Sequence, residues 1–139
     1  MSPFARLAAS SPTATDVGLL VLRVSFGLTM ALSHGWGKVS DLGKFTAVVA
    51  SKGFPIPGVT APFAAFSELL GGLLLAVGLA TRPAAVALLG TMIGAVVVVH
   101  GGDPFGKKEL GLAYAAVSVV LLLTGPGRFS LDRLLARRR

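Results

Sequence analysis

The sequence has no cysteine and few charged residues. Among its 139 residues Cys is absent, and Asp, Glu, Lys and Arg together make up 14%. Without thiols the chain cannot form a disulfide, a thiol nucleophile or a cysteine-ligated metal or iron–sulfur centre, so any redox role needs a bound or neighbouring cofactor. The scarcity of charge leaves little polar material to coat a water-soluble surface. These two absences disfavour a soluble domain.

Motifs of self-sufficient catalysis are also missing. The glycines are spread along the chain rather than set between a strand and a helix, so there is no phosphate-binding loop, and no nucleophile triad is visible. The formal net charge is +7, but the basic residues lie in short breaks and a tail rather than in one patch. We therefore expect anionic lipid headgroups, and no nucleic acid, as partners, and we do not expect standalone catalysis.

What the sequence does have is long apolar runs, since 53% of its residues are hydrophobic. At 1.5 Å per residue, four stretches approach the length needed to cross the ~30 Å hydrocarbon core. The predicted spans cover about residues 16–37, 60–80, 83–100 and 107–124. Residues 41–52 are too short to span and carry apolar side chains at helical spacing beside lysines. The predicted fold is all-α, a four-helix transmembrane bundle with a short interfacial amphipathic helix between the first two spans.

The two ends of the chain differ from the spans in composition. Residues 1–15 predict a flexible N-terminus, and residues 125–139 predict a basic tail lying on the membrane surface. A cleaved signal peptide is the alternative for the first apolar run, but that run is too long, contains Arg23 and lacks a small-residue cleavage site. The two termini and the loop between the second and third spans contain seven arginines, whereas the loops on the other side of the membrane contain five lysines. The positive-inside rule therefore predicts cytoplasmic termini.

Four ionisable side chains within or at the ends of these spans are the candidate functional residues: Arg23, His34, Glu68 and His100. A charge at the centre of a spanning helix costs about 2.5–3.5 kcal/mol on insertion scales, so each needs a partner or a function. Glu68 is the deepest, about 12 Å from the outer end of its helix. It either pairs with a cation, with Arg23 within reach, or becomes protonated and acts as a donor or proton carrier. The alternative for Glu68 is a purely structural ion pair, and for Arg23 a side chain that snorkels to the interface.

The two histidines both end spans on the same predicted side, with Glu68 one to two turns beneath them. This layout fits a proton path, a polar pocket for a quinone headgroup, or a weak metal site. A depth offset of about 9 Å between Glu68 and the histidines argues against a shared ion, so no metal is predicted. Each histidine can also be an ordinary interfacial residue.

Several motifs, taken in order from about residue 17 to 132, resemble the DoxX family of small bacterial membrane proteins. They are Leu22-Arg23-Val24, Ser33-His34-Gly35-Trp36-Gly37-Lys38, Lys52-Gly53-Phe54-Pro55-Ile56-Pro57, Ser67-Glu68-Leu69-Leu70-Gly71-Gly72, Gly78-Leu79-Ala80-Thr81-Arg82 and Gly125-Pro126-Gly127-Arg128-Phe129-Ser130-Leu131-Asp132. The resemblance implies four transmembrane helices in a bacterial cytoplasmic (inner) membrane. It also adds Lys38 and Arg82 to Arg23, His34 and Glu68 as a polar family signature.

The resemblance further implies a link to redox metabolism. Relatives include a subunit of thiosulfate:quinone oxidoreductase, and some members occur in membrane complexes with superoxide dismutase and a sulfurtransferase. The first hypothesis is therefore a membrane subunit of a quinone- or sulfur-linked oxidoreductase system, with quinone as the expected cofactor and with protein partners or self-association. Its predicted sign is an elongated apolar cavity that reaches Glu68. The alternatives are a non-catalytic scaffold or assembly factor, favoured by a closed bundle with Arg23 and Glu68 paired, and a small transporter, which needs a water-filled route.

Overall fold

The computed structural model describes residues 11–138, and over that range every regular element is a helix. Residues 1–10, most of the predicted flexible N-terminus, lie outside the described part. Helix α2 (Pro12–Leu28) continues through a π-helical turn, η1 (Thr29–Gly35), into α3 (Trp36–Ser40). The first long helix therefore begins before residue 16, with Pro12 in its first turn, where a missing N–H costs little.

The next elements follow the predicted order closely. Helix α4 (Leu42–Ser51) matches the predicted amphipathic helix, and the Asp41 carboxylate caps it by accepting from the Lys44 amide at 3.1 Å. Helix α5 (Pro57–Phe66), the π-helical turn η2 (Ser67–Gly71) and α6 (Gly72–Val77) form the second long helix. Because this helix starts at Pro57, Pro62 lies inside it rather than in its first turn, contrary to the sequence-based expectation.

A tight turn joins the second long helix to the third. Gly78 ends α6 with a positive φ of 70°, a conformation that glycine adopts without strain. Helix α7 (Thr81–Gly94) and the π-helical turn η3 (Ala95–Val99) follow at once, so the predicted antiparallel hairpin is confirmed. Helix α8 (Phe105–Thr124) returns beside α7, and a short helix, α9 (Leu131–Ala136), ends the described chain.

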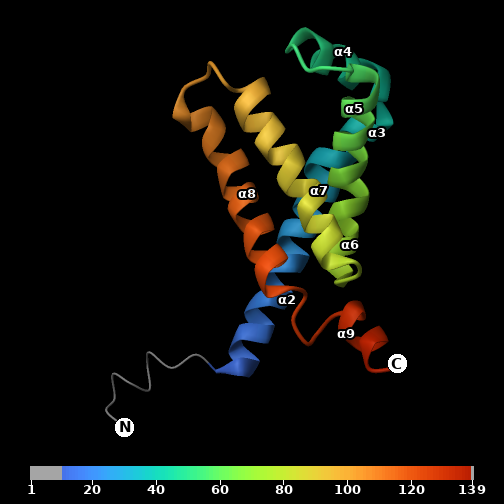
Figure 1. Ribbon diagram of the computed structural model, residues 1–139, viewed down its shortest axis with the longest axis vertical. Helices are drawn as coiled ribbons and strands as arrows, with labels where there is room; N and C mark the ends of the chain where they lie inside the picture. The colour runs from blue at the N-terminus through green and yellow to red at the C-terminus, as the bar shows by residue number, and fades with distance from the viewer. Residues whose placement is uncertain (1–10, 139) are drawn as a thin grey trace.

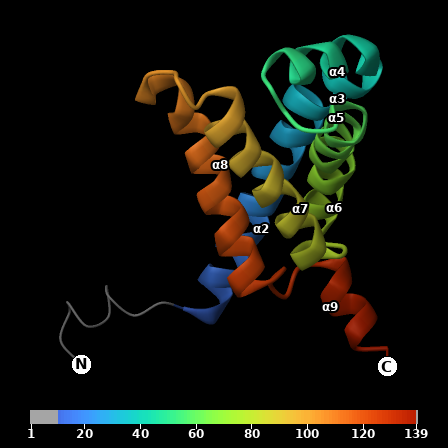
Figure 2. The ribbon, with the colours of Figure 1, turned by 45° about the horizontal axis from the view of Figure 1, so that its top comes forward.

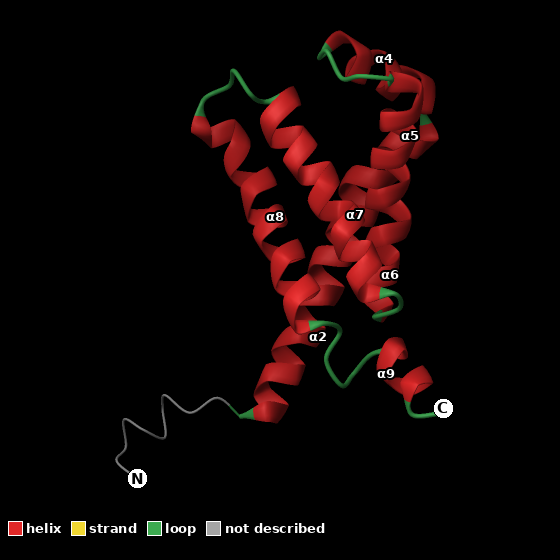
Figure 3. Cartoon of the chain, viewed as in Figure 1, coloured by secondary structure: helices red, strands yellow, loops and turns green. Residues whose placement is uncertain are grey.

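The long helices pack as antiparallel neighbours, as Figures 1 and 2 show. Helix α7 lies along α8, α2 lies along α6, and η1 lies against η2. Helix α2 approaches α6 closely because Gly27 faces Gly72, and a Cβ on Gly72 would lie only 2.6 Å from the Gly27 carbonyl oxygen. The all-helical arrangement is plain in Figure 3. The buried apolar core lies where these helices meet, and consists of Phe26, Met30, Leu75, Ala84, Ala85, Leu88, Met92 and Leu121.

The outward faces of the helices are apolar, as expected for a protein solvated by lipid. Leu32, Val97 and Leu123 are 62%, 65% and 73% exposed. Within residues 11–138, three helical stretches are long and apolar enough to cross a membrane: Pro12–Ser40, Pro57–Val77 and Thr81–Val99. Helix α8 has 20 residues, but its first two turns contain Lys107, Lys108 and Glu109. The predicted count of four spans therefore stays a prediction.

The two ends of the bundle are built differently (Figure 1). At one end, α4 and the segment after it cover the ends of α3 and α5; we call this the cavity end. At the other end, the chain after α8 passes beside α2 and folds back under α6 and α7, and the Asp132 carboxylate accepts from the amides of Ala80 and Thr81 at 2.8 and 2.9 Å. The Asp132 amide in turn donates to the Gly78 carbonyl at 2.8 Å. We call this end the clasp end.

Candidate functional site

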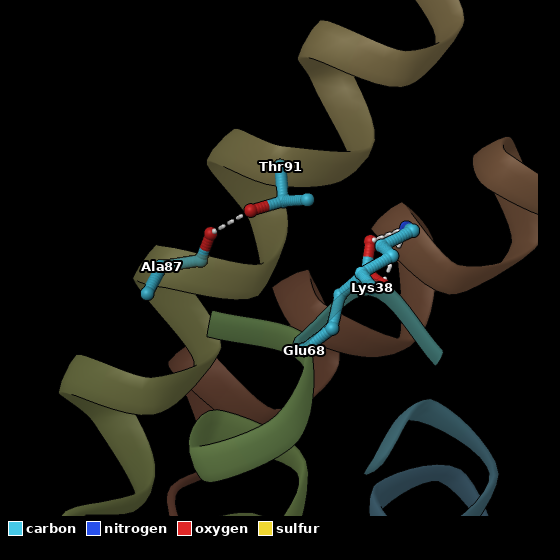
Figure 4. Close-up of polar contacts among 4 residues, drawn as sticks. All are labelled: Lys38, Glu68, Ala87 and Thr91. Atoms are coloured by element: carbon cyan, nitrogen blue, oxygen red, sulfur yellow. Dashed lines mark hydrogen bonds and ion pairs between the residues drawn. The ribbon is translucent and has the colours of Figure 1, made fainter. Parts of the chain in front are cut away.

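A buried ion pair joins the first and second long helices at the cavity end. Lys38, on α3, donates to both carboxylate oxygens of Glu68, on η2, at 2.6 and 2.5 Å (Figure 4). The Glu68 side chain is 2% exposed and that of Lys38 is 29% exposed. The two backbones can come this close because residue 35 is a glycine. A Cβ at this position would overlap backbone atoms of Glu68 and Leu69. Glu68 thus has a cation partner, and that partner reaches the edge of the buried region.

The ion pair between Arg23 and Glu68 that the sequence allowed is not formed. Arg23 is 1% exposed and donates to main-chain carbonyls of Leu75, Ala76 and Phe129 at 3.0, 3.4 and 2.6 Å. The reason is depth: Glu68 lies level with Gly35, and twelve helical residues from Arg23 to Gly35 correspond to about 18 Å. The Arg23 guanidinium is instead enclosed at the clasp end, beside Gly78.

A cavity of about 460 Å³ lies between α4, α5 and α7 at the cavity end. Its walls are mainly apolar, with Phe45, Phe54 and Phe63 as the aromatic members. Its polar lining residues are Lys38, Lys52, Thr60, Glu68, Thr91 and His100. Cavities of this size, mostly apolar with a few placed polar groups, are typical small-molecule and cofactor sites. The redox hypothesis predicted an apolar cavity that reaches Glu68, and this cavity has Glu68 in its lining.

His100 is the candidate residue that the structure brings to this cavity from the third helix. Its Nδ1 lies 2.7 Å from Oδ2 of Asp103, and both side chains are about one-third exposed. The hydrogen bond with His100 lowers the pKa of the Asp103 carboxyl, and the nearby charges of Lys107 and Lys52 act in the same direction. His100 therefore links the cavity wall to a carboxylate at the surface of the bundle.

Two other candidates lie elsewhere. His34, on η1, packs its ring edge-on against Tyr114 of α8, with ring centroids 5.6 Å apart, and does not line the cavity. Arg82, on α7, is exposed and donates from Nε to the Leu122 carbonyl at 3.2 Å. Of the predicted site residues, the cavity therefore unites Glu68 and His100 with the signature residue Lys38, and leaves Arg23, His34 and Arg82 outside.

Three π-helical turns lie around this region. Glu68 lies within η2, the last residue of η1 is Gly35, and η3 ends next to His100. A π-helical turn inserts a residue into the i→i−4 pattern, rotates the following side chains and often occurs at functional sites. These turns set the directions in which Lys38, Glu68 and His100 point.

The arrangement offers donors and acceptors rather than a metal cage. Within residues 11–138, no three His, Asp or Glu side chains gather closely enough to hold an ion. The Lys38 ammonium has three N–H groups, and two of them donate to Glu68, which leaves the third as a donor. The Thr91 hydroxyl donates to the Ala87 carbonyl at 3.0 Å, which leaves its oxygen as an acceptor at the cavity wall (Figure 4).

Comparison with known proteins settles the family. The family model described as DoxX matches residues 18–101. The chain belongs to the DoxX family. It is 29% identical to the inner membrane protein YqjF of Escherichia coli (strain K12) over 88% of this chain and 95% of that protein. It is 30% identical to the inner membrane protein YphA of the same organism, over 86% and 91% of the two chains.

A third relative of this DoxX protein has a name that refers to an activity. It is "Putative oxidoreductase CatD" of Bacillus subtilis (strain 168), which is 35% identical over 84% of this chain and 86% of that protein. No solved structure matches the chain. The matched DoxX region includes Lys38, Glu68 and His100, so the cavity lies within the family's shared part, whereas Phe129 and Asp132 of the clasp lie beyond it.

Sequence reasoning on this DoxX protein missed three features of the site. It gave Lys38 only as a signature residue, and it gave no role to Thr91 or Asp103. A signal for the ion pair was present, because Lys38 follows His34 by one helical turn and is the nearest cation on that face. A signal for Asp103 was present too, since an acid three residues after a histidine at a helix end can hydrogen-bond back to it.

Proposed function

We propose that this DoxX protein is a membrane subunit of a quinone- or sulfur-linked oxidoreductase system, and that the cavity holding Lys38 and Glu68 is its polar intramembrane site. The observation that carries this proposal is an apolar cavity of about 460 Å³ with a buried ion pair in its wall. A purely structural ion pair has no need of a cavity beside it. The printed name of CatD supports an oxidoreductase role, and two relatives named as inner membrane proteins support the location.

A quinone suits the chemistry of the walls. Its ring and tail would contact the aromatic and aliphatic lining, and a ring oxygen would accept a hydrogen bond from the Lys38 ammonium. The Lys38 and Glu68 charges cancel each other, so a neutral ligand meets no uncompensated charge from this pair. We propose that electrons reach the site through a partner protein or a second copy of the chain, since this chain has no cysteine with which to ligate an iron–sulfur cluster.

We further propose that α8 is a fourth span and that both termini face the cytoplasm. Twenty residues at 1.5 Å give about 30 Å, and the charged first turns of α8 would lie at the interface, where long side chains reach water. The arginines of the clasp end and α9 would then meet the anionic inner leaflet.

The test is native mass spectrometry of the protein extracted gently from its own membrane, with bound quinones and proteins identified. We expect quinone to co-purify with the wild type and to be lost in Glu68→Gln, because the neutral amide releases Lys38 from its fixed position. Glu109→Gln makes the same chemical change at an exposed position of α8, outside the cavity, and should retain quinone. If only partner proteins co-purify and Glu68→Gln leaves them unchanged, the scaffold alternative replaces this proposal.

A further inference from the structure

The His100 imidazole has one nitrogen whose role is set by its neighbour. Oδ2 of Asp103 lies 2.7 Å from Nδ1 of His100. An ordinary carboxyl is ionised at neutral pH, and the pKa of Asp103 is lowered further by its hydrogen bond with His100. An ionised carboxylate only accepts hydrogen bonds, so Nδ1 carries the proton. In neutral His100, Nε2 is therefore an acceptor, and His100 lines the cavity.

Lys38 has the opposite character. Its ammonium only donates, and Glu68 holds it in place through two hydrogen bonds. With neutral His100, the cavity therefore contains a donor on the first long helix and an acceptor at the end of the third.

Other charged groups around His100 do not supply a competing acceptor. Lys52, at the end of α4, lines the same cavity, and Lys107 lies near Asp103 from α8. Lys108 donates to the Gly101 carbonyl at 2.8 Å. All three are cations, so among these neighbours Asp103 is the acceptor that fixes the His100 tautomer.

We propose that this cavity is specific for the reduced, hydroquinone form of its ligand, with His100 as the residue that discriminates between the two redox forms. In a hydroquinone, one ring oxygen accepts from Lys38 and the opposite hydroxyl donates to Nε2 of His100. In a quinone, both oxygens only accept, so Nε2 of His100 stays without a partner. This inference rests on the proposed function and deepens it.

The preference should be modest and measurable. One additional hydrogen bond corresponds to about threefold to tenfold in affinity. A tenfold higher affinity for the reduced form raises the reduction potential of a bound two-electron couple by about 30 mV. The site would then stabilise a quinol until an electron acceptor reaches it.

The experiment is calorimetric titration of the full chain in lipid nanodiscs with a short-chain ubiquinone and, separately, with its quinol kept reduced by dithionite. The reductant leaves the protein unchanged because the chain has no disulfide to break. We expect the wild type to bind the quinol about threefold to tenfold more tightly than the quinone. His100→Leu should bring the two affinities together by weakening quinol binding, and His34→Leu, the matched change at the histidine outside the cavity, should keep the wild-type ratio.

The outcomes separate this inference from the function on which it rests. If neither form binds the wild type, the proposed quinone site fails. If both forms bind with equal affinity, or if His100→Leu keeps the preference for quinol, the quinone site stands and the role of His100 is overturned. If His100→Leu loses both forms, Asp103→Ala decides, because it retains the imidazole but frees its tautomer. A ratio that is unchanged in Asp103→Ala overturns the proposal, and a reduced ratio supports it.

Discussion

The two buried charges of this protein are stabilised in opposite ways. At the clasp end, Arg23 donates to three main-chain carbonyls, which belong to α6 and to the segment after α8. At the cavity end, Glu68 depends on one flexible side chain, Lys38, which is partly exposed. Main-chain carbonyls cannot ionise, and they cannot move away unless the backbone that carries them moves, whereas a lysine side chain can change partner. The difference suggests that Arg23 serves the fold and that the pair of Lys38 and Glu68 is available to a ligand.

The largest loss of stability is expected when Arg23 is replaced, because its role is assigned to the fold. Arg23→Leu removes the donor of the Ala76 and Phe129 carbonyls, whereas the Leu75 carbonyl keeps the Gly78 amide as a donor at 3.1 Å. At about 1–3 kcal/mol for each unsatisfied carbonyl, we expect a loss of about 2–6 kcal/mol in stability. Thermal unfolding in detergent, followed by the fluorescence of Trp36, measures this loss. The matched control is Arg82→Leu, which removes an exposed arginine with one carbonyl bond and should change stability by less than about 1 kcal/mol. Equal effects at the two positions would contradict the structural role of Arg23.

A double-mutant cycle sharpens the other half of the comparison. Lys38→Met leaves Glu68 buried without its cation, and we expect a loss of about 2 kcal/mol, since breaking a buried pair costs more than replacing it. Adding Glu68→Leu should restore most of that loss. The same thermal unfolding assay tests this, and a double variant as unstable as Lys38→Met alone would show that the ion pair is not what Lys38 contributes.

A smaller effect is expected at Asp132, which closes the clasp. The two oxygens of its carboxylate each accept from one backbone amide. In Asp132→Asn the side-chain NH₂ would replace one oxygen and face an N–H donor, so we expect the free energy of unfolding to fall by about 1 kcal/mol. Asp41→Asn is the matched control, because Asn caps a helix nearly as well as Asp does and Asp41 accepts from one amide. A Tm that falls equally in both variants would contradict the bidentate role.

The same carboxylate predicts a pH dependence. Burial raises the pKa of Asp132, but the backbone hydrogen bonds from Thr81 and Ala80, with the charge of Arg23, outweigh it and lower the pKa overall. A lowered folded-state pKa gives stability that is present above the ordinary carboxyl value of about 3.9 and is lost as pH falls through the folded value. The gap in Tm between wild type and Asp132→Asn should therefore begin to narrow below about pH 4 and should narrow further as the pH falls. A gap that stays constant from about pH 5 to about pH 2 would contradict this account.

Much of the fold was visible in the sequence because lipid imposes simple rules. Apolar length, helix-ending glycines and the short break before Pro83 predicted the helices and the hairpin, with limits that differ by a few residues. The start at Pro12 was missed because the apolar run begins later than the helix. The extension of the first helix to Ser40 was missed because the apolar run ends near Gly37, whereas the helix continues through Gly35, which allows η2 to approach.

The site was only partly predictable. The cost of burying Glu68 predicted a partner, but the identity of that partner depended on helix register, and each π-helical turn shifts the register by one residue. The partners of Arg23 are main-chain carbonyls, and these have no signature in a sequence. The cavity itself arises from how α4 covers α5 and α7, which follows from tertiary packing rather than from any local motif.

The ion pair of Lys38 and Glu68 also has a consequence for how the chain enters the bilayer. A helix that carries a lone charge near its centre inserts at a cost of about 2.5–3.5 kcal/mol, and α2 carries Arg23 while η2 carries Glu68. Both charges find partners on the other long helix, through Lys38 in one case and through the Leu75 carbonyl in the other. Insertion of the two helices is therefore thermodynamically coupled: the translocon should release them into lipid as a pair, already joined at Gly27 and Gly72.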